Sequence, residues 1–114
     1  MDTNDKRRSE RFVSFAHVRI IDAEMYGYIT NISSTGIKTL LTAKVFTLKQ
    51  EAQYNLELYA PELNLPRFSC IGLLKWMNVI DINHYEAGFE ILSFSNDTAK
   101  LLFDRLIETY KRFD

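Results

Sequence analysis

The feature of this sequence that most limits its possible folds is a change of hydrophobic period close to residue 95. Before that point, short segments rich in β-branched and aromatic residues are separated by polar or proline-containing connections, a pattern typical of strands joined by tight turns. Hairpin-length connections favour antiparallel pairing, because parallel strands need long crossovers. Strands are expected over residues 12–21, 25–31, 37–42, 53–60, 67–78 and 85–94.

After residue 95 the apolar residues follow the three-four spacing of a single helix face. Ser95 or Asn96 can cap the start of this helix. Acidic Asp97 in the first turn and basic residues 111–112 in the last turn agree with the helix dipole. The apolar face consists of Ala99, Leu102, Phe103, Leu106, Ile107, Tyr110 and Phe113. The prediction is an all-β protein with a terminal helix: a small six-stranded antiparallel β-barrel plus a C-terminal α-helix that plugs or flanks it.

Local patterns add detail to this prediction. Residues 43–52 are compatible with either a loop or a helical turn, and two prolines bracket the connection over 61–66. The segment 67–78 is apolar on both faces, so another element should cover part of its outer side. Simple alternation puts Trp76 on the same face as Leu74, which makes it a core residue. Gly88 predicts a bulge or a close approach within the last strand.

Composition excludes several classes of protein. A chain of 114 residues is long enough for one domain, and 46% hydrophobic residues exclude a disordered protein. A net charge of −1 disfavours general binding of DNA or RNA through a broad basic face. No apolar run is long enough for a membrane span, and residues 1–12 lack the core of a signal peptide. With Cys70 expected to be a buried inert thiol, these features favour a cytoplasmic location.

Catalytic patterns are absent from the sequence. His17 and His84 stand in no metal-ligand spacing with Cys70 or a carboxylate, so no metal site is expected. Neither a nucleophile elbow nor a glycine-rich phosphate loop occurs. The prediction is a protein that is not an enzyme and has neither catalytic residues nor a cofactor.

The first cluster that carries chemistry is basic and lies over residues 6–11. Four cationic side chains and Glu10 give it a net charge of +3, which leaves −4 for the rest of the chain. An arginine fork donates two parallel hydrogen bonds to a phosphate or to the O6 and N7 edge of guanine. Arg7 and Arg11, four residues apart, could clamp one ligand from two sides. A short basic segment at the start of a chain is also commonly a solvated tail.

The second cluster is the turn over residues 31–36, with the sequence NISSTG. The amide of Asn31 can bind a base edge, and the Ser33 hydroxyl and nearby backbone N–H groups can bind a phosphate oxygen. Gly36 has no Cβ where a ligand must come close. The same residue types suit any tight turn, so the cluster alone is a weak indication.

Together the two clusters resemble the signature of the PilZ domain family, an RxxxR motif followed about twenty residues later by a (D/N)xSxxG turn. The matching segments are RRSER at 7–11 and NISSTG at 31–36. They are followed in order by a long strand ending in GLLKWM (72–77), a last strand with AGFEI (87–91) and a terminal helix. The resemblance covers residues 6–113 as a single domain, with a flexible basic arm over 1–11, the barrel over 12–94 and the helix over 95–114.

The resemblance implies a function and a set of ligand-binding residues. PilZ domains bind the bacterial second messenger cyclic di-GMP and relay it to motility, biofilm or exopolysaccharide machinery. By position, the arginines of the RxxxR motif correspond to Arg7 and Arg11, with Arg8 beside them. Asn31, Ser33 and Gly36 correspond to the residues of the second motif. Trp76 could stack on a base, although a core position is the preferred interpretation. An effector protein in trans is the expected partner.

Other interpretations stay open at this point. A PilZ-fold adaptor could act through protein contacts with weak or no nucleotide binding. An unrelated small barrel could bind single-stranded nucleic acid by stacking bases on Tyr26, Tyr28 and Tyr59, although the net charge disfavours it. The apolar face of the helix could pack on its own barrel or on a second copy in a homodimer.

Overall fold

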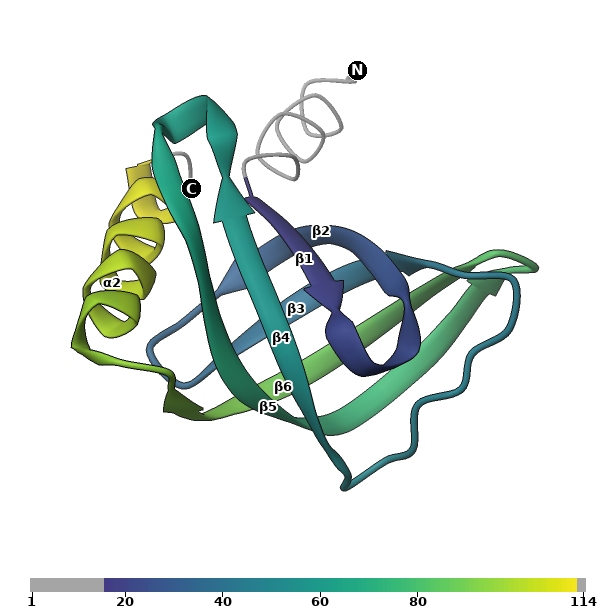
Figure 1. The fold of residues 1–114 in the computed structure, drawn as a ribbon. Coiled ribbons are helices and arrows are strands. Elements are labelled where there is room, and N and C mark those ends of the chain that lie inside the picture. Colours follow the sequence, from purple (N-terminus) through teal and green to yellow (C-terminus); the bar gives the residue numbers. More distant parts are fainter. Residues whose placement is uncertain (1–15, 113–114) are drawn as a thin grey trace, which may run out of the picture.

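A computed structural model describes residues 16–112 of the chain (Figure 1). It contains β1 (Ala16–Ile20), β2 (Met25–Ile32), β3 (Gly36–Thr42), β4 (Gln53–Ala60), β5 (Leu65–Asp81), β6 (His84–Phe94) and α2 (Asp97–Arg112), with short 3-10 turns at Ile21–Ala23 and Pro61–Leu63. The strands close into a barrel in the order β1-β2-β3-β6-β5-β4, and each neighbouring pair is antiparallel. The predicted six-stranded antiparallel barrel with a C-terminal helix is confirmed.

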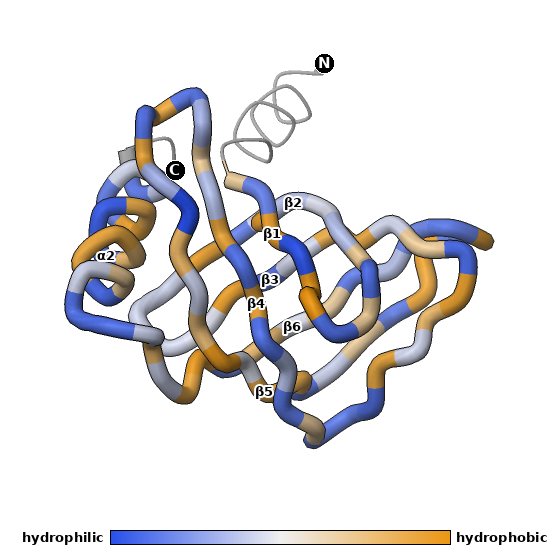
Figure 2. Tube along the Cα trace, viewed as in Figure 1, coloured by the Kyte–Doolittle hydropathy of each residue, from blue (hydrophilic) through white to orange (hydrophobic). Residues whose placement is uncertain are grey.

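Alternating residues of the strands fill the barrel interior. On β1, Ala16, Val18 and Ile20 are buried, and the residues between them face outward. Figure 2 shows this alternation of hydrophobic and hydrophilic residues along the strands. Such a period fixes the register of each strand, because a slip of one residue would expose the whole apolar set.

The helix α2 closes one end of the barrel, opposite the projecting β5–β6 hairpin (Figure 1). Asn96 caps it: its Oδ1 accepts a hydrogen bond from the N–H of Ala99 at 2.8 Å. The rings of Phe94 and Phe103 lie 5.1 Å apart, and the Tyr110 hydroxyl donates to the carbonyl of Ile29 at 2.6 Å. Of the predicted apolar face, Phe113 lies outside the described residues. The other six residues are buried or half-buried, so this face packs on its own barrel.

Several strand boundaries differ from the predictions. Residues 12–15 of the first predicted strand lie outside the described residues, and Ile21 begins a 3-10 turn that ends at Ala23 and is capped by Glu24, where φ is 53°. The connection over 61–66 is shorter than predicted, because β5 begins at Leu65 and includes Pro66. The proline is tolerated near the strand start, beside a register irregularity between Leu58 and Ala60.

The connection between β3 and β4 is a loop without a helix. Phe46 and Leu48 pack against the barrel core, and the rings of Phe46 and Tyr85 lie 4.8 Å apart. The backbone reverses at Glu51, where φ is 68°. Within residues 16–112, no helix has the length and apolar character to span a membrane.

Candidate functional site

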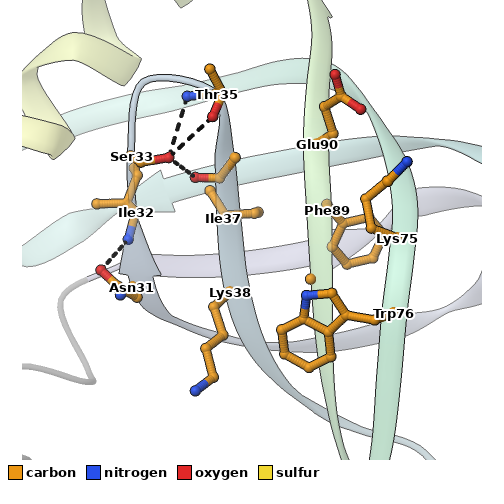
Figure 3. Close-up of a pocket in the computed structure, with 12 residues that line it drawn as sticks. Asn31, Ile32, Ser33, Thr35, Ile37, Lys38, Lys75, Trp76, Phe89 and Glu90 are labelled. Carbon is orange, nitrogen blue, oxygen red and sulfur yellow. Dashed lines mark hydrogen bonds between the residues drawn. The ribbon is translucent and has the colours of Figure 1, made fainter.

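A hollow of about 590 Å³ lies on the outer surface of the barrel, where the β2–β3 turn approaches β5 and β6 (Figure 3). We call it the outer pocket. Because neighbouring strands present their residues side by side, residues of four strands contribute to the same surface. Its lining residues are Asn31, Ile32, Ser33, Thr35, Gly36, Ile37, Lys38, Lys75, Trp76, Gly88, Phe89 and Glu90. The structure therefore brings Asn31, Ser33 and Gly36 together in one pocket.

The β2–β3 turn is held by hydrogen bonds of Ser33. Its N–H donates to the carbonyl of Gly36 at 2.9 Å, which closes the hairpin. Its Oγ accepts from the N–H of Thr35 at 3.3 Å and lies 3.4 Å from Thr35 Oγ1 (Figure 3). The hydroxyl is therefore fixed at the edge of the outer pocket before any ligand binds.

A β-bulge directs Asn31 toward the pocket. The inward residues of β2 are Met25, Gly27 and Ile29, so regular alternation would also turn Asn31 inward. The register with β3 shifts between Ile29 and Asn31, and Asn31 is exposed opposite Lys38. Its Oδ1 accepts from the N–H of Ile32 at 2.8 Å. Among residues 16–112 its NH₂ group has no hydrogen-bond acceptor, so it can donate to a ligand.

Gly36 has a structural role that the sequence did not indicate. A Cβ at this position would lie 2.6 Å from the carbonyl oxygen of Phe89 on the neighbouring strand. The backbone of β6, rather than a ligand, therefore occupies the space that the missing side chain leaves. Gly36 still lines the pocket through its backbone.

The prediction that Trp76 is a core residue is wrong. Its side chain is 38% exposed, and its indole lies over Gly88 in the wall of the outer pocket (Figure 3). The physical reason is a bulge in β5 between Leu74 and Trp76, which reverses the alternation that the sequence analysis assumed. The predicted close approach at Gly88 is confirmed, because a Cβ there would lie 2.2 Å from the indole Nε1.

The charged side chains of the outer pocket are Lys38, Lys75 and Glu90. Lys38 lies 3.8 Å from Glu86 and Lys75 lies 3.4 Å from Glu51, measured between Nζ and the nearest carboxylate oxygen. Both lysines are nearly half exposed, so these ion pairs are weak and the ammonium groups can turn to an anion. The charges that line the pocket therefore sum to only +1.

The predicted ligand residues Arg7, Arg8 and Arg11 lie outside the described residues. The point from which they extend is described: Ala16, at the start of β1, pairs with Ile29, two residues before Asn31. Arg11 is five positions from Ala16, and five residues span at most about 18 Å. Chain length alone therefore limits how far Arg11 can lie from Ala16 to about this distance.

A second aromatic group lies elsewhere on the barrel surface. The ring of His17 is 4.8 Å from Tyr28 and 4.8 Å from Tyr59, and it stacks on Tyr59 with an interplanar angle of 12°. The guanidinium of Arg67 lies 4.1 Å from the centroid of Tyr59. Neighbouring side chains therefore occupy ring faces on which bases would stack, which disfavours nucleic-acid binding through Tyr28 and Tyr59. Tyr26, at 62% exposure, stands at the surface.

The remaining candidate groups have structural explanations. Cys70 is buried, as predicted, and burial raises the pKa of its thiol to about 12, which makes it unreactive. The N–H of Asn83 and the ring of His84 lower the pKa of the Asp81 carboxyl at the β5–β6 hairpin. Within the part of the chain that the structure describes, no three His, Cys, Asp or Glu side chains are grouped to hold a metal ion.

The fold is similar to that of MrkH from K. pneumonia in its apo state, with a TM-score of 0.64 and 17% identity over 85% of this chain and 46% of that one. A weaker likeness, with a TM-score of 0.43 and 13% identity, is to Borreliella burgdorferi PlzA in complex with c-di-GMP, over 98% of this chain and 50% of that one. This chain thus spans about half the length of either protein. The likeness to MrkH shows the fold alone. No family model and no curated protein matches the sequence.

Proposed function

We propose that the protein is a receptor for cyclic di-GMP in the bacterial cytoplasm and that the outer pocket is its ligand site. The observation that carries this proposal is the position of Asn31 and Ser33 beside the only tryptophan of the chain, in a surface pocket. The resemblance of RRSER and NISSTG to the PilZ motifs supports the same ligand.

The ligand offers two guanine bases and two phosphates, and the pocket has groups that suit both. The NH₂ of Asn31 can donate to the acceptor edge of a guanine, and the indole of Trp76 offers a face for stacking. The hydroxyl of Ser33, which is fixed by the turn, lies where a phosphate oxygen can accept from it. Lys38 and Lys75 add positive charge to the lining.

The pocket lining alone does not balance the charge of the ligand. Cyclic di-GMP carries two negative charges, whereas the lining charges sum to +1. We assign the missing positive charge to Arg7 and Arg11, with Arg8 beside them, because an arginine fork binds phosphate and guanine with paired hydrogen bonds. Binding would then fix residues 7–11 across the pocket. The combined surface of this segment and the ligand would be recognised by a partner protein in motility, biofilm or exopolysaccharide control.

Calorimetric titration with cyclic di-GMP, GTP and cyclic di-AMP tests the proposal. We expect the wild type to prefer cyclic di-GMP, and Arg7→Ala and Arg11→Ala each to weaken binding about 10- to 100-fold through the loss of charge-assisted hydrogen bonds. Arg105→Ala, which removes an exposed arginine on α2, is the matched control and should bind as the wild type does. Unchanged affinity in both motif variants would refute the assignment of the site.

One observation favours the second candidate, a PilZ-fold adaptor that acts through protein contacts. Three aliphatic side chains at the end of the β5–β6 hairpin, Val79, Ile80 and Ile82, are 64%, 52% and 81% exposed. Figure 2 shows hydrophobic residues at this end of the hairpin. Exposed aliphatic groups that gather at one place are typical of protein-binding surfaces. A wild type that binds none of the three nucleotides in the titration would favour the adaptor over the receptor.

A further inference from the structure

The acidic residue in the outer pocket, Glu90, has no explanation in the functions assigned so far. Its side chain is exposed and lines the pocket, and among the described residues its carboxylate has neither a hydrogen-bond donor nor a cationic partner. The two lysines of the pocket form their weak ion pairs with other carboxylates, Lys38 with Glu86 and Lys75 with Glu51. A carboxylate in the wall of a site for a dianion repels the phosphates unless it faces a part of the ligand that donates hydrogen bonds.

Glu90 lies next to the β2–β3 turn and on the strand over which the Trp76 indole lies. It pairs with Gly36 on one side and Leu73 on the other, which puts it beside the β2–β3 turn. Along β6 it is two residues from Gly88, over which the Trp76 indole lies, and two residues of a strand cover about 6.8 Å. Figure 3 shows Glu90 and Trp76 along the same wall of the pocket. This spacing along the backbone of β6 is comparable with the length of a purine base.

We infer that Glu90 is a specificity-determining residue that accepts hydrogen bonds from the N1–H and the exocyclic N2 amino group of one guanine. This inference rests on the proposed function, since it names the base that the same pocket selects. A carboxylate has two acceptor oxygens and no donor, which matches the adjacent N1–H and N2–H donors of guanine. Adenine presents an acceptor at N1 and would meet the carboxylate with repulsion. Glu90 therefore favours guanine and rejects adenine.

The test compares Glu90→Gln with the wild type by calorimetry, using cyclic di-GMP, cyclic di-IMP and cyclic di-AMP. The inosine ligand keeps N1–H but lacks the exocyclic amino group. We expect the wild type to bind cyclic di-GMP more tightly than cyclic di-IMP and far more tightly than cyclic di-AMP. In Glu90→Gln, affinity for cyclic di-GMP should fall about tenfold, in the range of a lost bidentate base contact. The preference over cyclic di-AMP should shrink by a similar factor, because a glutamine can both donate to and accept from adenine.

Glu62→Gln makes the same change of charge outside the pocket and should leave all three affinities unchanged. If Glu90→Gln raises the affinity for all three ligands equally, Glu90 only repels phosphate and the inference is wrong. An equal loss of affinity for all three ligands would mean that Glu90 binds a ribose hydroxyl, which would also overturn the inference. In both cases the wild type still binds cyclic di-GMP, so the proposed function survives. A wild type that binds none of the three would overturn both proposals.

Discussion

Replacement of Gly88 by alanine tests whether the Trp76 indole is held in the pocket wall by the absence of a side chain beneath it. A Cβ at position 88 would lie 2.2 Å from Nε1, 2.4 Å from Cε2 and 2.8 Å from Cζ2 of Trp76. All three atoms belong to the indole and none to the backbone. The ring can therefore move out of the way by rotation, while β5 and β6 stay paired. We expect a folded barrel in which the indole has left its position.

The energetic cost follows from the area that the indole would return to water. A well-packed aromatic side chain buries about 150–250 Å², and Trp76 is already 38% exposed. Rotation away from β6 would expose a further 50–100 Å² or so, which corresponds to roughly 1–2.5 kcal/mol of unfolding free energy. In a Trp76→Ala background the obstruction is gone. In that background Gly88→Ala should leave the free energy of unfolding unchanged or raise it slightly, because glycine is unfavourable in strands.

Urea unfolding followed by circular dichroism gives the free energies of unfolding of the wild type and the three variants in this cycle. The emission of the only tryptophan should shift to longer wavelength in Gly88→Ala, because its indole becomes more exposed. Gly36→Ala is the matched control: its Cβ would meet the Phe89 carbonyl oxygen at 2.6 Å. A backbone atom cannot rotate away, so Gly36→Ala should lower the free energy of unfolding more than Gly88→Ala does. Trp76→Ala should not reduce this loss. The reasoning is refuted if Gly88→Ala leaves both stability and emission unchanged, or if its cost persists without the tryptophan.

Two further predictions concern groups in the core. Burial raises the pKa of the Cys70 thiol from about 9 to about 12, so the folded state retains a proton that the unfolded chain loses. Stability should therefore fall as pH rises above 9, with a contribution of about 1.4 kcal/mol per pH unit; equal slopes for the wild type and Cys70→Ala in alkaline urea unfolding would contradict this. Tyr110→Phe removes the hydroxyl that donates to the Ile29 carbonyl at 2.6 Å and should lower the free energy of unfolding by about 1–2 kcal/mol. A Tyr110→Phe protein as stable as the wild type would show that the carbonyl finds another donor.

Where alternation is uninterrupted, the sequence was sufficient to place the elements. The strand over Gln53–Ala60 was predicted with its observed bounds, since inward Leu56 and Leu58 alternate with more polar residues. The helix was predicted with Ser95 or Asn96 as its cap, and the structure shows that Asn96 is the residue that caps it. These features are local, and each depends on residues a few positions apart.

The errors come from features that belong to pairs of strands. A bulge is defined by the register with a neighbouring strand, so the alternation within 67–78 could not show that β5 gains a residue at Lys75. The clash that requires glycine at position 36 is likewise with the Phe89 carbonyl, 53 positions away in the chain. One available indication of the exposed tryptophan was Gly88, a glycine inside an otherwise apolar strand.

The outer pocket depends on two bulges of the same kind. The extra residue in β2 turns Asn31 outward, and the extra residue in β5 turns Trp76 outward. In a regular ladder Asn31 would point into an apolar interior, where its amide would need buried partners. The indole of Trp76 would also enter the barrel and overfill a core that Leu74 and Phe89 already occupy. The irregular register therefore removes a polar and an oversized side chain from the core, and it presents both in the outer pocket that Ser33 also lines, where we propose that the nucleotide binds.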